Sequence, residues 1–284
     1  MPGLLDGPSQ TSSDRTDTGR TRRYAPLLRS LLIQWGIVAV AVGVWAAVTA
    51  SGLVSGVLLP PVGSTASALG QLLTSSTGLH NLGVTGLELL GAFGLSAPVG
   101  IALGFVLGEI KFRRRHEAIG GTADNLLSTL LATPKFVFLP VLIVILGVSY
   151  WEKVVYALGD GLIVVIIGTA AASYTADQQV RLVSRALRMN KWQFFWKVYL
   201  PGALPVLVEA LRLSLILTIS GVLLAELYIS NAGIGYLIFQ WGTNFQLPQL
   251  FAGVILVALL AIVINTIFRV LEARMNRWRT SRQV

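Results

Sequence analysis

The chain has 284 residues and a net charge of +9; 54% of its residues are hydrophobic and only 12% are charged. A soluble domain usually carries about 25% charged residues, so this composition argues against a soluble enzyme, a disordered protein or a fibrous protein and favours a polytopic helical membrane protein. The absence of cysteine excludes disulfides and thiolate metal sites, and the two histidines lie too far apart in the sequence to suggest a metal centre.

Residues 1–28 are rich in small polar residues and arginine and are predicted to form a disordered cytoplasmic tail. After this tail, six stretches have the roughly 20 mostly apolar residues that a transmembrane helix needs. They cover residues 31–50, 82–108, 118–146, 154–172, 203–227 and 250–268. The third stretch is interrupted by Pro134 and Pro140, and the second, third and fifth are long or polar enough to line a protein interior.

The basic residues predict the orientation of these spans. Nineteen of the 22 Lys and Arg residues lie before the first span, between the second and third, between the fourth and fifth, or after the sixth. With six spans all four groups fall on the same side, and the opposite loops contain only Lys153. Basic residues favour the cytoplasmic side, so both termini are expected to be cytoplasmic in a cell membrane. The charge then serves orientation and lipid contact and gives no reason to expect nucleic-acid binding.

Small residues recur every four positions along the second span. They are Ala92, Ser96, Gly100, Gly104 and Gly108. Such a stripe allows another helix to approach closely. The sequence leaves open whether that helix belongs to the same subunit or to a partner.

Charged residues within spans are functional candidates because they are costly to place in a bilayer. Glu88, Lys135, Arg212 and Glu226 are therefore candidates for the translocation path. Structural alternatives stay open: Lys135 could mark a helix break, Arg212 could pair with Glu209 three residues earlier, and Glu226 could cap the following loop. Asp124 and Asp160 have no partner that the sequence makes visible. No phosphate-binding loop or nucleophile motif is present. We therefore expect that the chain is not an enzyme, that it holds no cofactor and that it does not hydrolyse ATP by itself.

The loop over residues 177–201 carries two amphipathic runs. Leu182, Ala186 and Met189 follow helical spacing, and a second run of aromatic residues ends at Pro201. The aromatic residues of the second run are Trp192, Phe195, Trp196 and Tyr199. Exposed aromatic side chains need a cover, which could be the membrane surface or a groove on a soluble partner.

In this loop the sequence resembles the transmembrane permease subunits of ABC importers, in the group that serves nitrate, sulfonates, taurine and related solutes. Those permeases carry the pattern Glu-Ala-Ala, three residues, Gly, nine residues, Ile-x-Leu-Pro. Here Val198, Leu200 and Pro201 match its end, whereas Arg188 stands at the Gly position. The Glu-Ala-Ala positions are Leu182, Val183 and Ser184. Further matching segments include Leu59 to Val62, Ala132 to Pro134, Leu204-Pro205, Glu209 to Arg212, Ala225-Glu226 and Gly233 to Ile238.

The resemblance implies an all-α type I ABC importer permease fold with six transmembrane helices. It implies a second permease copy, identical or related, two separate subunits that bind ATP and Mg, and an extracytoplasmic solute-binding protein. The loop over 182–200 would contact the ATPase. The residues expected at that contact are Leu182, Ser184, Ala186, Arg188, Met189, Trp192, Phe195, Trp196 and Pro201.

The substrate is expected to be a small anion such as a sulfonate, taurine or nitrate, because Lys135 and Arg212 suit an anion. A pyrimidine-type vitamin precursor and a secondary transporter without ATPase remain alternatives. Since the family's Gly permits a turn, its replacement by Arg188 predicts that Asn190 adopts the left-handed conformation instead. The departure also leaves open an altered ATPase docking or a second permease that carries the intact motif.

Overall fold

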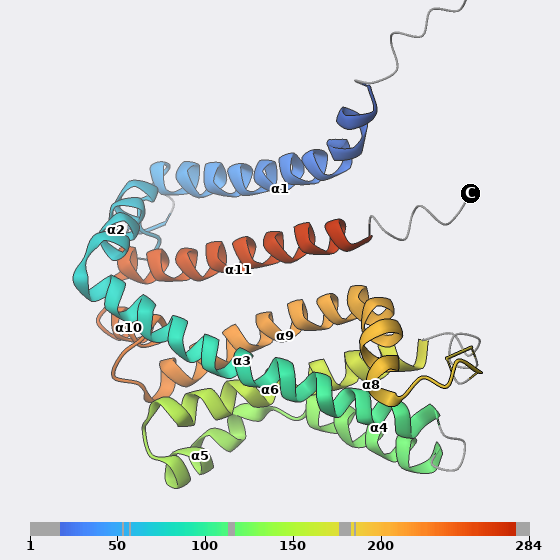
Figure 1. The fold of residues 1–284 in the computed structure, drawn as a ribbon. Coiled ribbons are helices and arrows are strands. Elements are labelled where there is room, and N and C mark those ends of the chain that lie inside the picture. The colour runs from blue at the N-terminus through green and yellow to red at the C-terminus, as the bar shows by residue number, and fades with distance from the viewer. Residues whose placement is uncertain are drawn as a thin grey trace, which may run out of the picture. The chain divides into compact units, whose positions relative to one another are not determined.

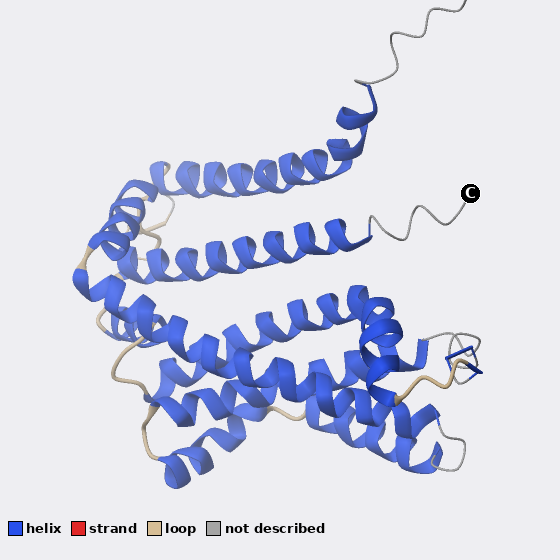
Figure 2. Ribbon diagram, in the orientation of Figure 1, coloured by secondary structure: helices blue, strands red, loops and turns tan. Residues whose placement is uncertain are grey.

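A computed structural model describes the backbone of residues 18–52, 54–56, 58–112, 117–175, 183–184 and 186–276. Within these residues the chain forms helices and no strand (Figure 2). The elements are α1 (Thr18–Ala50), α2 (Val62–Thr74), α3 (Ser76–Phe112), α4 (Glu117–Ala132), a 3₁₀ turn (Lys135–Phe138), α5 (Leu139–Leu146), α6 (Tyr150–Thr175), α8 (Lys191–Phe194), a π-helical turn (Phe195–Tyr199), α9 (Leu200–Ile229), α10 (Ile234–Thr243) and α11 (Leu247–Asn276). Of the tail predicted to be disordered, residues 1–17 lie outside the described residues, whereas residues 18–28 belong to α1, so the prediction is wrong for them.

The chain divides into two compact units, residues 1–62 and residues 63–284. In the first unit, the segment that follows α1 folds back along the helix. The indole N–H of Trp45 donates a hydrogen bond of 3.1 Å to the carbonyl oxygen of Pro60. The second unit contains the elements on which the candidate sites depend.

Four described helices are long and apolar enough to cross a membrane: α3, α6, α9 and α11. The segments Gly120–Ala132 and Lys135–Leu146 meet at an angle of 82° and form a fifth span if they are counted together. The described apolar stretch of α1, Trp35–Ala50, is shorter than a span requires. The all-helical membrane fold is therefore confirmed, while the count of six spans is not.

The third predicted span is broken at one of its two prolines. The backbone at Pro134 is extended, and the 3₁₀ turn follows it. The helix stops here because proline lacks the N–H that would continue it. Pro140 lies in the first turn of α5, where the missing N–H costs nothing. The same residue type thus interrupts the chain at one position and begins a helix at the other.

The core of the second unit lies where α3, α6 and α9 pack together (Figure 1). All five small residues of the stripe on α3 are buried. A side-chain carbon added at Gly100 would lie 2.6 Å from the Cβ of Val165, and one at Gly104 would lie 2.5 Å from the Cβ of Thr169. The stripe therefore packs against α6 of the same chain, which is one of the two arrangements that its spacing predicts.

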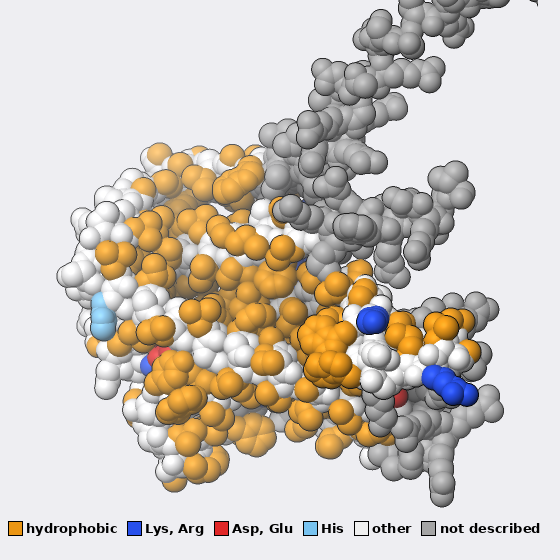
Figure 3. Space-filling model, in the orientation of Figure 1, with side chains coloured by type: hydrophobic (Ala, Val, Ile, Leu, Met, Phe, Trp, Pro, Cys, Tyr) orange, Lys and Arg blue, Asp and Glu red, His pale blue; other side chains and the backbone are white. Residues whose placement is uncertain are grey.

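The helices of this unit have two opposite ends. At one end α3 and α6 begin, α9 finishes and α10 follows; we call this the α10 end (Figure 1). At the other end α3 finishes and α8 leads into α9; we call this the α8 end. Between the ends, hydrophobic side chains cover most of the visible face (Figure 3), as expected of helices that meet lipid or another apolar surface.

Candidate functional site

At the α8 end the chain turns at Arg188. We call residues 186–200, which contain this turn and α8, the corner. Arg188 has a φ of 51°, in the left-handed region, and the N–H of Met189 donates to the carbonyl of Ser184 at 3.1 Å. A left-handed residue followed by this bond to the residue five positions earlier is the Schellman helix ending, which usually uses glycine. Arg188 thus adopts the conformation that the family's Gly would supply, so the expectation that Asn190 takes it is wrong.

Asn190 instead begins the next helix. Its side-chain oxygen accepts a hydrogen bond from the N–H of Gln193 at 2.7 Å, and the Gln193 side chain accepts one from the N–H of Asn190 at 3.2 Å. This reciprocal pair is a capping box and satisfies N–H groups that a helix start leaves unpaired. Two caps, separated by one residue, therefore fix the angle of the corner.

The helix does not end at Pro201, contrary to the sequence prediction. A π-helical turn over Phe195–Tyr199 leads directly into α9, and the N–H of Leu200 donates to the carbonyl of Phe195, five residues earlier. Proline lacks an N–H, and its ring clashes with the carbonyl four residues before it. The wider π turn makes room for that ring, so the helix bends and continues (Figure 1).

Apolar side chains anchor this corner to the transmembrane helices. The rings of Phe195 and Phe105 meet edge to face with centroids 4.9 Å apart. Phe194, Phe195 and Leu200 belong to one cluster that also includes residues of α3, α6 and α9. Those residues are Ile101, Phe105, Ala172, Ala203 and Leu207. The corner therefore packs against three helices at once.

The two tryptophans of the corner face outward. Trp192 is 70% exposed and Trp196 is 50% exposed, and their rings contact each other with centroids 5.5 Å apart. The sequence pattern groups Phe195 with them, but Phe195 packs against the transmembrane helices instead. The sequence does not identify Phe194 and Phe105 as anchors, because only their packing distinguishes them from other apolar residues.

The other residues expected at the ATPase contact divide in the same way. Ala186 and Arg188 are exposed, Met189 is partly exposed and Ser184 is buried. Leu187, which the sequence analysis did not single out, is 68% exposed. Leu182 lies outside the described residues.

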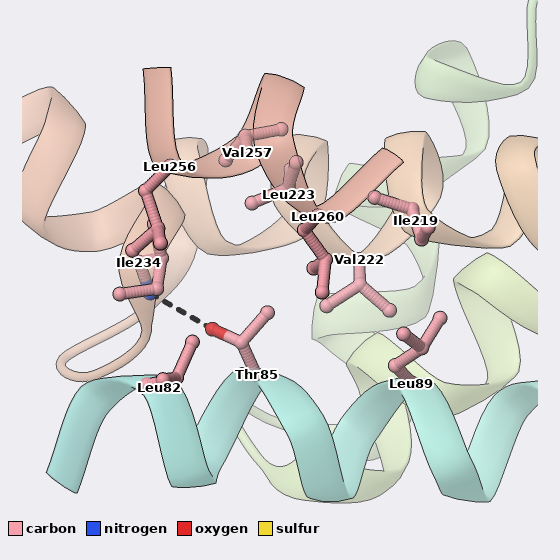
Figure 4. A pocket seen from close by; sticks show the side chains of 10 residues that line it. All are labelled: Leu82, Thr85, Leu89, Ile219, Val222, Leu223, Ile234, Leu256, Val257 and Leu260. Carbon is pink, nitrogen blue, oxygen red and sulfur yellow. Dashed lines mark hydrogen bonds between the residues drawn. The ribbon is translucent and has the colours of Figure 1, made fainter. Parts of the chain in front are cut away.

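A second polar site holds the start of α10. The carboxylate of Glu226 accepts hydrogen bonds from the hydroxyl of Thr85 at 2.6 Å and from the N–H of Gly235 at 2.7 Å. The Thr85 oxygen also accepts from the N–H of Ile234 at 2.8 Å (Figure 4), and the side chain of Asn81 accepts from the N–H of Gly233. Glu226 therefore caps the loop after α9, as its structural alternative predicts, and joins it to α3.

An ion pair lies next to this network. Lys153 of α6 pairs with Glu88 of α3, and its ammonium group also donates to the hydroxyl of Ser230 at 2.9 Å. Glu152 is fully buried beside them, and neither of its carboxylate oxygens has a hydrogen-bond partner among the described residues. Sequence reasoning named Glu88 and Glu226 but missed Lys153, because their separation along the chain hides the contact.

An apolar cavity of about 20 Å³ lies between α3, α9, α10 and α11 (Figure 4). Leu82, Leu89, Val222, Ile234 and Leu260 are among the side chains that line it. This volume is about that of one water-sized probe, so the cavity is too small for a solute.

Three further ion pairs involve charges that the sequence left open. Lys135 at the helix break pairs with Asp160 of α6 at 2.8 Å. Lys111 pairs with Asp124 at 2.5 Å, so the description of the two aspartates as unpartnered is wrong. Arg212 lies 3.7 Å from Glu209, as the spacing predicts. Among the described residues no three histidine or carboxylate side chains gather closely enough to hold a metal ion.

The family model for "binding-protein-dependent transport system inner membrane component" matches residues 100–278, which is more than half of the chain. The chain belongs to this family. It is a multi-pass permease of an ABC transporter, and it is a transport subunit rather than an enzyme.

Two known transport permeases are similar to this chain over most of its length. The putative aliphatic sulfonates transport permease protein of Bacillus subtilis is 28% identical over 86% of this chain and 86% of its own length. The taurine transport system permease protein of Escherichia coli is 26% identical over 94% of this chain and 96% of its own length. The inward-facing MetNI methionine ABC transporter is structurally similar, with a TM-score of 0.59, 19% identity, and coverage of 71% of this chain and 99% of that one. That likeness supports the type I importer permease fold.

We expect Arg188→Gly to stabilise the corner. A non-glycine residue in the left-handed region costs about 1–2 kcal/mol, and the greater freedom of glycine in the unfolded chain takes back about half of that. Hydrogen exchange at the Met189 amide should slow about threefold, which corresponds to a gain of about 0.7 kcal/mol. Arg188→Ala is the matched control, since it removes the long side chain but keeps the strained Cβ. Equal exchange rates in the two variants would contradict the assignment.

We expect Thr85→Val to loosen the start of α10. The change keeps the side-chain shape but leaves the Glu226 oxygen and the Ile234 N–H without their partner, and each such loss costs about 1–3 kcal/mol. The thermal midpoint in detergent should fall, and the Ile234 amide should exchange faster. Thr129→Val is the control, because Thr129 is exposed and its hydroxyl donates to a carbonyl of its own helix. A Thr85→Val midpoint equal to that of the control would show that the network contributes little.

Proposed function

We propose that this chain is the membrane-spanning subunit of an ATP-driven importer for small organic or inorganic anions, with sulfonates and taurine as the first candidates. ATP and Mg would bind to separate subunits. Two permease chains would form the passage, and an extracytoplasmic binding protein would deliver the solute. The α8 end would face the cytoplasm, together with both termini.

The observation that carries the proposal is the pair of exposed tryptophans on an anchored corner. Trp192 and Trp196 present an aromatic surface to the outside, while Phe195 behind them packs against the transmembrane helices. An aromatic surface of this kind favours a groove on a protein partner. A partner that moves the tryptophans would move α3 and α9 with them, because the caps at Arg188 and Asn190 and the buried phenylalanines make the corner stiff.

The substrate class rests on two supports. The aliphatic sulfonates and taurine permeases are similar over most of the chain. In addition, the chain places lysine and arginine side chains within its spans, where they suit an anion. A pyrimidine-type vitamin precursor would need no such cation, so it is the alternative that uptake measurements should include.

The test is affinity purification of the tagged chain from its native membrane in mild detergent, followed by mass spectrometry. We expect a stoichiometric ATP-binding subunit with the wild-type chain and its loss with Trp192→Ala/Trp196→Ala, because buried interface tryptophans contribute about 2 kcal/mol or more each. Trp151→Ala is the control, since Trp151 is 59% exposed but lies at the α10 end.

Two results would contradict the proposal. Recovery of the chain without any ATP-binding subunit would show that the proposed energy source is absent. Retention of the ATPase by the double variant, at the wild-type level, would place the coupling surface elsewhere. A second, related permease in the complex would instead identify the assembly as a heterodimer.

A further inference from the structure

The ion pair between Lys135 and Asp160 lies at the middle of the membrane. The α6 span runs over Tyr150–Ala172, and Asp160 is ten residues from its first residue and twelve from its last. At a rise of 1.5 Å per residue, Asp160 lies about 15 Å from one end and about 18 Å from the other. The hydrocarbon core of a bilayer is about 30 Å thick. Because Lys135 lies 2.8 Å from Asp160, its ammonium group shares this depth.

The backbone at Lys135 is irregular at the same depth. The helical segments on either side of Thr133 and Pro134 meet at 82°, and a short 3₁₀ turn follows the break. Non-helical backbone inside a bilayer is tolerated only where protein buries it or where it lines a water-filled space. The chain itself does not cover this turn, since Phe136, Val137 and Phe138 are 60%, 58% and 50% exposed. The turn is therefore accessible from outside the chain, to a partner subunit, a passage or lipid.

The exposure of this pair distinguishes it from the lysine pair at the α10 end. The side chains of Lys135 and Asp160 are 18% and 17% exposed, so a small solute that reaches the turn can reach the charges. Lys153 and Glu88 are only 8% and 2% exposed, and Lys153 also binds Ser230. Lys153 is three residues from the first residue of the α6 span, so it lies close to the α10 end of that span. That second pair fits a structural role at the α10 end.

We propose that the ammonium group of Lys135 is the mid-membrane binding point for a small oxyanion, such as a sulfonate or nitrate, and that Asp160 is the counter-ion with which the anion exchanges. The proposal rests on the function proposed above and names the residues that would carry it. An ammonium group has three N–H donors, so it can engage an anion oxygen before it leaves Asp160. No proton transfer or covalent step is involved.

The aspartate gives the site a function that a lone lysine could not provide. An unpaired ammonium group in a spot of low dielectric would hold an anion tightly. Conduction requires binding that is strong enough for entry and weak enough for release. With Asp160 close by, the site is neutral before the anion arrives, and the carboxylate competes for the lysine when the anion leaves. The pair therefore keeps the residence of the anion short.

The experiment measures ATP-driven uptake of radiolabelled ethanesulfonate, taurine and nitrate by the complete transporter in proteoliposomes. Lys135→Met/Asp160→Leu replaces the pair with apolar side chains of similar size, a change that often leaves stability unaltered or higher. We expect anion uptake to fall by about tenfold or more, which corresponds to the loss of one charge-assisted hydrogen bond. Recovery of the intact complex and its thermal midpoint check that the fold is kept.

Two further variants sharpen the assignment. Asp160→Asn leaves the lysine without its counter-ion, so both KM and the maximal rate should fall as the anion is held longer. Lys111→Met/Asp124→Leu is the matched control, because it removes an ion pair at the α8 end of α3 and should leave the KM for the anions unchanged.

The outcomes separate this inference from the function on which it rests. If the wild-type complex imports none of the three solutes, the proposed substrate class fails and this inference fails with it. If the wild-type complex imports them and Lys135→Met/Asp160→Leu does so with the same KM and rate, the pair is structural and only this inference is overturned.

Discussion

A polar group at membrane depth is costly without a partner within the protein, and the sites of this permease depend on the partners that the chain supplies. Water is absent from the bilayer core, so an unpaired charge or N–H group there costs several kcal/mol. The chain meets the constraint differently at three depths. At the α10 end, Glu226, Thr85 and Asn81 pair with the backbone that begins α10. At mid-membrane, Lys135 pairs with Asp160. At the α8 end, two helix caps satisfy the corner.

These depths correspond to different mechanical roles. The network at the α10 end is buried and joins α3, α9 and α10 through hydrogen bonds, so it favours a fixed arrangement. The pair halfway along α6 is partly exposed beside an irregular turn, and we propose that a solute can replace Asp160 as the partner of Lys135. The corner at the α8 end combines a stiff interior with an exposed aromatic surface. In the proposed importer these would be a fixed frame, an exchangeable contact for the solute and a stiff connection to the ATPase.

The sequence predicted the elements better than their contacts. Apolar length located the spans of α3, α6, α9 and α11, and Pro134 located the break between Ala132 and Lys135, because both signals are local. The partners of Asp124 and Asp160 were missed, since Lys111 and Lys135 lie on other segments and only tertiary packing brings them together. Pro201 was expected to end a helix, but a π turn relieves its clash. Arg188 was passed over for Asn190 because residue preference favours asparagine, whereas the hydrogen bond from Met189 fixes the turn at Arg188.

We propose that ATP hydrolysis on a separate subunit drives solute through this chain. The most direct measurement is ethanesulfonate uptake into proteoliposomes that contain the chain with its co-purified partners, with ATP supplied only on the α8 side and with ion gradients collapsed by ionophores. We expect ethanesulfonate uptake that requires ATP and is unaffected by the ionophores. Uptake by the chain alone that follows an ion gradient and ignores ATP would contradict it.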